Sequence, residues 1–141
     1  MTRFLLDTNV ISETARQKPD PNVTRWLGDL PTLTLPSVGV YEIASGIQRL
    51  AAGKKREFLE VWFAELLGAE TEVLPFDRNA ALGCALLESE ARRKGRTFEL
   101  RDLLILAIAK SRNLSVATRN VAHFRGYGVP LYDPFNDLQI L

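Results

Sequence analysis

The chain has 141 residues, of which 46% are hydrophobic and 25% charged, values that are ordinary for one globular domain. Its 18 basic and 17 acidic residues leave a formal net charge of +1, so no global basic field demands a nucleic-acid partner. A single cysteine, Cys84, excludes an internal disulfide and a cysteine-based zinc site, and no apolar run approaches the roughly 20 residues of a membrane span. We therefore expect one cytoplasmic domain over residues 1–141, with neither a signal peptide nor a membrane segment.

Short apolar runs along the chain predict strands. The five runs lie at residues 3–6, 33–36, 71–76, 114–118 and 129–132. Longer amphipathic or alanine-rich segments separate them, and such segments are typical of helices. Strands that alternate with helices favour a parallel α/β sheet with right-handed crossovers.

Cap and stop residues mark where several of these helices should begin and end. Asp20 followed by Pro21 is a helix start, and Ser37 and Asp77 are candidate N-caps for later helices. Gly95 is a candidate stop. Two helices should be largely core: the segment after Asp102 is apolar on most sides, and another helix carries an apolar stripe of Phe58, Trp62 and Leu66.

Three acids border apolar sequence: Asp7 in "LLDT", Glu42 in "VYEI" and Asp102 in "LRDLLI". Each has a simpler interpretation taken alone, as a helix cap, a solvated helix residue or a charge favoured by a helix dipole. In an open α/β sheet, however, ligands bind outside the carboxyl ends of the strands. An uncompensated buried carboxylate is costly, so a divalent cation with oxygen ligands, Mg²⁺ or Mn²⁺, would stabilise the three together.

The stretches "LLDTNVISE", "VYEIASGI", "RDLLILAIAKSRNLSVATRN" and "HF", in that order, resemble the PIN-domain ribonucleases, specifically the VapC-type toxins of VapBC toxin–antitoxin systems. "DTNVISE" together with "LPFD" is most similar to the plasmid-stability branch of StbB and FitB-like proteins. The resemblance implies a PIN-like three-layer α/β sandwich, whose central parallel sheet has about five strands in the order 3-2-1-4-5 and is flanked by helices.

The same resemblance implies an activity and a set of partners. The activity is that of a Mg²⁺- or Mn²⁺-dependent endoribonuclease, a hydrolase in which a metal-activated water cleaves RNA phosphodiester bonds. The implied partners are a cognate VapB-type antitoxin, the RNA substrate and a second copy in a homodimer, with promoter DNA bound only through the antitoxin.

Carried over residue by residue, the resemblance makes Asp7, Glu42 and Asp102 the metal ligands. Asn120 takes a fourth catalytic position that is often an acid, and it brings a hydrogen-bonding amide without charge. Residues expected to support the acids are Thr8, Asn9 and Thr118. Glu13 is either an acid on a helix surface or a further supporting residue that pairs with a basic side chain.

Basic residues are candidates for weaker contacts with RNA. Arg101 and Arg119 flank the proposed site and could bind substrate phosphate. The clusters at 53–57 and 91–96 are either solvated helix ends or RNA contacts. His123, the only histidine, is expected in a loop beside Phe124, so a pair of histidines for acid–base work through the 2′-hydroxyl is impossible.

Three other functions compete with this interpretation. The chain could be a weakly or non-catalytic PIN-fold partner of a DNA-binding antitoxin in an autoregulatory complex. Phosphoryl transfer through Asp7 as nucleophile is disfavoured, because the residue two positions later is Asn9 rather than a second acid. Nucleotide binding is disfavoured because no glycine-rich loop follows a predicted strand.

Overall fold

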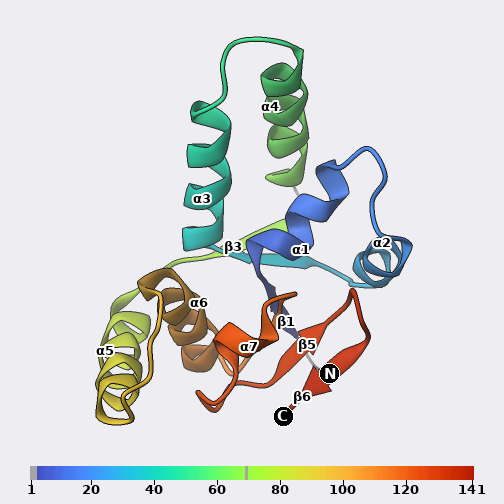
Figure 1. Ribbon diagram of the computed structural model, residues 1–141. Coiled ribbons are helices and arrows are strands. Elements are labelled where there is room, and N and C mark those ends of the chain that lie inside the picture. The colour runs from blue at the N-terminus through green and yellow to red at the C-terminus, as the bar shows by residue number, and fades with distance from the viewer. Residues whose placement is uncertain (1–2, 69) are drawn as a thin grey trace.

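The computed structural model describes residues 3–68 and 70–141 (Figure 1). Its strands are β1 (Phe4–Leu6), β2 (Leu33–Pro36), β3 (Thr71–Leu74), β4 (Ser115–Ala117), β5 (Leu131–Asp133) and β6 (Leu138–Ile140). Its helices are α1 (Thr8–Ser12), α2 (Pro21–Gly28), α3 (Ser37–Gln48), α4 (Lys54–Leu66), α5 (Arg78–Arg93), α6 (Leu100–Ser111) and α7 (Val121–Phe124), with a 3₁₀ turn, η1 (Glu13–Ala15), after α1.

The strands form a mostly parallel arrangement, which confirms the predicted α/β class. β1, β4 and β5 pair in parallel in that order, and β2 pairs in parallel with β3. β1 also contacts β2, so the strands follow the predicted order 3-2-1-4-5, although no ladder joins β1 to β2 in the described residues.

The final strand, β6, was not predicted. It pairs antiparallel with β5 and closes the sheet. Asp133 holds the tight turn between them, because its Oδ1 atom accepts from the N–H of Phe135 at 2.8 Å, and Asp137 completes it at a φ of 51°. A connection this short can only reverse the chain, so β6 cannot be parallel.

Most of the predicted helix boundaries are confirmed. Asp20 and Asp77 accept from backbone N–H groups and cap α2 and α5. Gly95 follows α5 at a φ of +63°, a left-handed conformation that suits glycine at a helix end. The prediction for Ser37 is wrong: Pro36 occupies the cap position, and the Ser37 hydroxyl accepts from the N–H of Phe76 at 3.2 Å.

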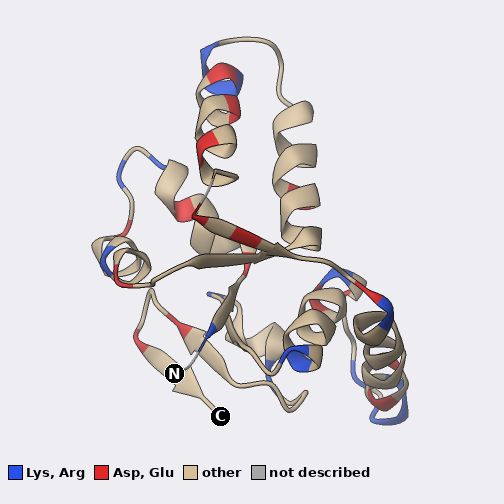
Figure 2. Ribbon diagram, turned by 180° about the vertical axis from the view of Figure 1, so that it is seen from behind, with Lys and Arg blue, Asp and Glu red and all other residues tan. Residues whose placement is uncertain are grey.

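Helices cover both sides of the strands, with α3 and α4 side by side on one side of β2 and β3 and with α5 and α6 on the other (Figures 1 and 2). α6 is buried along its central turns, as predicted, and Cys84 of α5 packs in the same core. α4 is only a partial cover: Trp62 and Leu66 pack against the core, but Phe58 is 59% exposed, so its prediction as core was wrong. Within the described residues, no helix is both long enough and apolar enough to cross a membrane.

Candidate active site

Asp7 is the first residue after β1, and its backbone N–H donates to the carbonyl oxygen of Ala117 in β4 at 2.9 Å. The residue has no exposed surface. Its Oδ1 atom accepts from the N–H of Thr8 at 2.8 Å, and its Oδ2 atom accepts from the Thr118 hydroxyl at 2.8 Å and the Asn9 amide at 3.2 Å. Asp7 is therefore both a helix cap and a carboxylate held rigidly at the carboxyl end of its strand.

Glu42 and Asp102 reach the same place from two helices. Glu42 lies in α3 and is partly buried, while Asp102 lies in the first turn of α6 and is only 3% exposed. The Thr8 hydroxyl donates to Oε1 of Glu42 at 3.1 Å, so α1 links the first acid to the second. The structure thus brings together the three acids that the sequence singled out.

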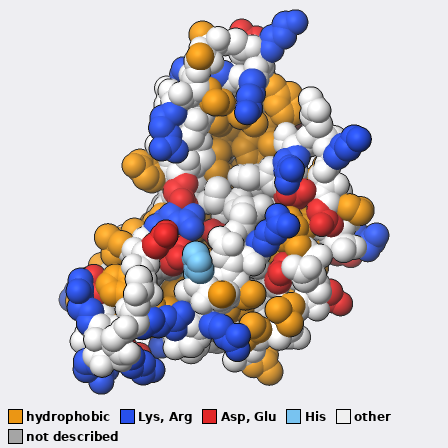
Figure 3. Space-filling view, in the orientation of Figure 1, with side chains coloured by type: hydrophobic (Ala, Val, Ile, Leu, Met, Phe, Trp, Pro, Cys, Tyr) orange, Lys and Arg blue, Asp and Glu red, His pale blue; other side chains and the backbone are white. Residues whose placement is uncertain are grey.

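The guanidinium of Arg101 lies between these carboxylates. Its Nη1 atom is 2.7 Å from Oε2 of Glu42 and 4.0 Å from Oδ1 of Asp7, and its Nη2 atom is 2.9 Å from Oδ1 of Asp102. Figure 3 shows acidic side chains grouped with basic ones on this face, beside the single histidine. Three carboxylates with one guanidinium leave the cluster formally negative.

Burial raises the pKa of both Asp7 and Asp102, because it penalises the ionised form of each carboxyl group. The Thr118 hydrogen bond and the charge of Arg101 act in the opposite direction on the pKa of Asp7. Burial alone would lower the pKa of Arg101, but its hydrogen bond to Glu42 and the nearby acids raise it above its ordinary value. Arg101 is therefore always charged, and the acids still lack a full complement of positive charge.

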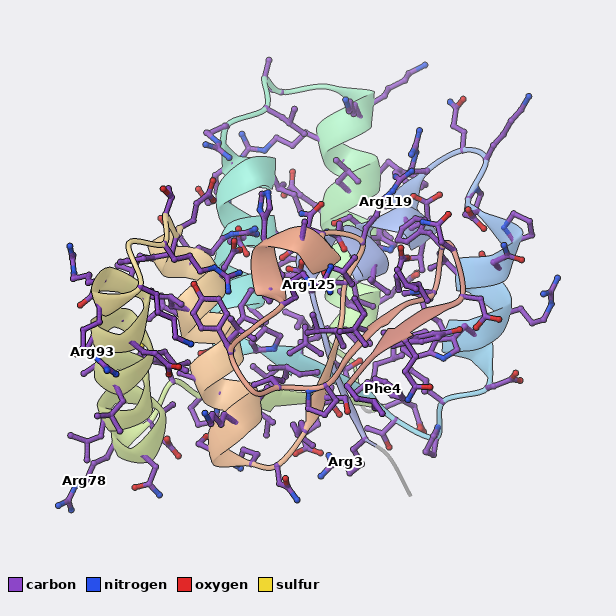
Figure 4. The ribbon with its side chains drawn as sticks, turned by 60° about the horizontal axis from the view of Figure 1, so that its bottom comes forward. Arg3, Phe4, Arg78, Arg93, Arg119 and Arg125 are labelled. Atoms are coloured by element: carbon purple, nitrogen blue, oxygen red, sulfur yellow. The ribbon has the colours of Figure 1, made fainter. Side chains whose placement is uncertain are left out.

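The segment after β4 supports Asp7 through its backbone and through Thr118. The Thr118 hydroxyl accepts from the N–H of Asn120 at 3.0 Å, and Oδ1 of Asn9 accepts from the N–H of Arg119 at 3.2 Å. The Arg119 guanidinium stacks over the ring of Phe135, 4.6 Å from its centre, and Figure 4 shows this arginine close to α1. Asn120 is exposed at the start of α7, whose N–H groups its side chain does not cap.

Glu13 is placed elsewhere. It is buried, its Oε2 atom accepts from the N–H of Asp20 at 2.7 Å, and its Oε1 atom is 3.5 Å from Nη1 of Arg16. These contacts hold the segment that leads into α2. Glu13 is therefore buried rather than placed on a helix surface, and its bonds to the Asp20 N–H and to Arg16 stabilise the segment before α2.

His123 was predicted as a loop residue, but it lies in α7 with its Nδ1 atom 3.6 Å from Oδ2 of Asp102. Its side chain is 57% exposed, so it stands at the mouth of the cluster. Sequence reasoning missed this proximity and the central position of Arg101. The position of Arg101 next to Asp102 at the start of a helix was the signal in the sequence that could have indicated its central position.

The predicted basic clusters lie on helix ends. The cluster at 91–96 closes α5, where the ribbon of Figure 2 is coloured for basic residues. Lys94 pairs with Glu90 at 2.9 Å and Arg92 with Glu88 at 3.6 Å, both one helical turn apart. These contacts suit a solvated helix end.

The acidic cluster suits a hard divalent cation, because its ligand atoms are carboxylate oxygens. These carboxylates are largely buried, and their negative charge is not fully balanced by nearby cations. As the side chains stand in the described ranges, no three acids, histidines or cysteines surround one point closely enough to hold a metal ion. The Arg101 guanidinium lies between two of these acids, 2.7 Å from Glu42 and 2.9 Å from Asp102. The three carboxylates are therefore suitable metal ligands by their chemistry, and the Arg101 guanidinium lies between two of them.

These features define an α/β protein with an acidic site at the carboxyl edge of a mostly parallel sheet. The chain belongs to the PIN-domain family, whose sequence profile matches residues 4–128. The family resemblance predicted from the sequence is thereby confirmed.

Named relatives cover almost the whole chain. Toxin FitB of Neisseria gonorrhoeae is 36% identical over 140 residues, 95% of this chain and 99% of FitB. Plasmid stability protein StbB of Pseudomonas syringae pv. tomato is 35% identical over 94% of this chain and 98% of its own length. VapC ribonuclease Y4jK of Sinorhizobium fredii is 34% identical over 94% of this chain and 97% of its own length.

Solved structures agree with this placement. The crystal structure of FitAcB from Neisseria gonorrhoeae superposes with a TM-score of 0.86 at 34% identity, covering 94% of this chain and 98% of that one. FitAB bound to an IR36 DNA fragment gives a TM-score of 0.83 at 32% identity, covering 94% and 95% of the two chains. The structural relatives of this chain are therefore complexes of toxin–antitoxin systems.

Proposed function

We propose that this chain, as a single PIN domain over residues 1–141, is the toxin component of a type II toxin–antitoxin module and a metal-dependent endoribonuclease. The observation that carries the proposal is the convergence of three carboxylates, two of them almost completely buried, at the carboxyl edge of the sheet. Buried carboxylates with shifted pKa values cluster at functional sites, and relatives of this chain are named as a toxin and as a ribonuclease.

Asp7, Glu42 and Asp102 would hold one divalent cation, Mg²⁺ or Mn²⁺, through their carboxylate oxygens. When bound, the ion would neutralise the scissile phosphate and lower the pKa of the attacking water. Thr118 and Asn9 hold Asp7 in its orientation, and Thr8 does the same for Glu42. Because Asp7 and Glu42 are held by donors other than Arg101, these two carboxylates keep their orientation without rearrangement of the backbone.

Hydrolysis by water in line with the leaving group breaks the bond from phosphorus to the 3′-oxygen and leaves a 5′-phosphate and a 3′-hydroxyl. The chain has one histidine, so the alternative route through the 2′-hydroxyl lacks a second imidazole for proton transfer. Asn120 would add an uncharged amide oxygen near the substrate, and Arg119 a cation for a neighbouring phosphate.

The partners follow from the same proposal. A VapB-type antitoxin would bind this chain, a second copy would form a homodimer, and DNA would be bound only through the antitoxin. Relatives solved as toxin–antitoxin complexes, one with a DNA fragment, support this part. The site of action would be the cytoplasm, where the RNA substrate lies.

The experiment is cleavage of a structured RNA by the purified chain in Mn²⁺ or Mg²⁺, with Asp102→Asn as the test and Glu99→Gln as the matched control. Glu99 is exposed and precedes the same helix without a capping bond from its side chain. Asp102→Asn should lower the cleavage rate by about 100-fold or more, and Glu99→Gln should leave it nearly unchanged. Cleavage that survives Asp102→Asn, or that ignores EDTA, would refute the proposal.

A second candidate is a weakly catalytic partner of a DNA-binding antitoxin. The observation that favours it is Asn120, which is exposed and uncharged where the resembled family often has an acid. Expression of this chain alone separates the two candidates. Growth arrest relieved by the antitoxin supports the nuclease, and normal growth with an intact promoter complex supports the partner.

A further inference from the structure

The position of Arg101 raises a question about how the site is loaded. Its guanidinium donates to Glu42 at 2.7 Å and to Asp102 at 2.9 Å, and it lies 4.0 Å from Asp7. These are the three carboxylates that the proposed metal ion needs. Arg101 therefore provides these acids with one positive charge and with hydrogen bonds from its planar guanidinium. The same acids would otherwise bind a divalent cation.

The guanidinium contacts Oε2 of Glu42 and Oδ1 of Asp102, two of the oxygens that an ion between these acids would use. A Mg²⁺ ion requires oxygens at about 2.1 Å around one point, but within the described ranges no three acidic groups approach one point in that way. For Glu42 and Asp102 to converge on one ion, the guanidinium between them would have to move. In the described structure the cluster is closed on Arg101, and closure on a metal ion would be an alternative arrangement.

A groove beside the site can accept the Arg101 side chain if it leaves the acids. Its side chain is 31% exposed, unlike Asp7 and Asp102. A groove of about 520 Å³ begins at Glu42 and Arg101 and continues over the exposed side chains of Tyr41 and Leu100. The aliphatic stem of a displaced arginine can lie on this apolar surface while its charge stays in water.

We propose that Arg101 is an exchangeable counter-cation of the site: it holds the three carboxylates together in the metal-free protein and leaves them when a divalent ion binds. This inference rests on the proposed metal-dependent function. By linkage, whatever favours the Arg101-bound state weakens metal binding by the same factor. Arg101 therefore competes with the metal ion for the carboxylates, and this competition sets the concentration of ion at which the site becomes occupied.

Two measurements on the RNA-free protein test the exchange. Calorimetric titration with Mn²⁺ compares the wild type with Arg101→Met, and Arg119→Met is the matched control because its guanidinium stacks on Phe135 near the same site. Arg101→Met should bind Mn²⁺ about tenfold tighter, the ratio expected on releasing one partly buried ion pair, whereas Arg119→Met should change affinity by about threefold at most. Equal or weaker binding by Arg101→Met would overturn the proposal.

The second measurement follows Arg101 in the wild type, so it does not depend on a variant that folds. In protein labelled with ¹⁵N-arginine, the Nη–H signals of Arg101, whose two nitrogens donate to Glu42 and Asp102, are identified by their loss in Arg101→Met. Saturating Mg²⁺ should move these signals to the positions of a free arginine and remove their protection from exchange. Signals that stay in place while metal binds would refute the exchange but leave the nuclease intact, whereas failure of every variant to bind metal would refute both.

Discussion

Replacing Thr118 by valine tests whether the support of Asp7 matters as the structure implies. The Thr118 hydroxyl is completely buried, donates to Oδ2 of Asp7 at 2.8 Å and accepts from the N–H of Asn120 at 3.0 Å. Valine has the same shape without the hydroxyl, so the change removes two hydrogen bonds and leaves no cavity.

The expected loss can be worked from these contacts. A hydrogen bond to a charged group contributes about 1.5–3 kcal/mol, and the bond from Asn120 is closer to about 1 kcal/mol because that N–H can reach water instead. Removing the buried hydroxyl regains part of its desolvation cost, so the net loss should be about 2–3 kcal/mol. For a domain of this size, the melting temperature should fall by about 5–10 °C.

The assay is urea unfolding of the metal-free protein at pH 7, with Thr118→Ser as the control. Serine keeps both hydrogen bonds and loses one buried methyl group, worth about 1 kcal/mol. Thr118→Val should therefore be the less stable variant. If Thr118→Val unfolds at the same or a higher urea concentration than Thr118→Ser, the hydroxyl does not stabilise the Asp7 carboxylate.

Two further changes have expected outcomes. Burial raises the pKa of Asp7 in the folded protein, so ionising Asp7 lowers the stability of the wild type as pH rises through that pKa. In urea unfolding with EDTA, Asp7→Asn should therefore gain stability relative to the wild type between pH 4 and pH 7, and a constant difference would contradict the shift. The buried Tyr127 hydroxyl finds no hydrogen-bond partner among the described residues. The variant Tyr127→Phe keeps the ring beneath Arg96, so it should be neutral or stabilise the protein by up to about 1 kcal/mol. A clear loss of stability in this variant would show that the hydroxyl has a partner.

The sequence was sufficient for the parts of the site that local chemistry determines. Asp7 directly follows an apolar strand and Asp102 begins an apolar helix, so each acid was placed by the element beside it. The parallel order of the strands then brought their carboxyl ends to one edge. Ser37 was misplaced because Pro36 already satisfies the geometry of a helix start, which leaves the serine hydroxyl for another chain segment.

The rest depended on contacts between residues far apart in the chain. The sequence left Glu13 open between a surface acid and a supporting residue, because its partner is a backbone N–H seven residues later and a loop conformation of that kind has no periodic signal. Arg101 could be expected near the acids, yet only the relative positions of α3 and α6 set its fork between Glu42 and Asp102. The short, exposed strand β6 carries little hydrophobic pattern, so it escaped prediction.

The most direct test of the central claim is a crystal structure of this chain soaked in MnCl₂, recorded at a wavelength where manganese scatters anomalously. The account predicts one anomalous peak bounded by carboxylate oxygens of Asp7, Glu42 and Asp102 at about 2.1–2.3 Å, with the Arg101 guanidinium moved away from that point. No peak at a saturating concentration, or a peak held by other residues while the same preparation cleaves RNA, would contradict it.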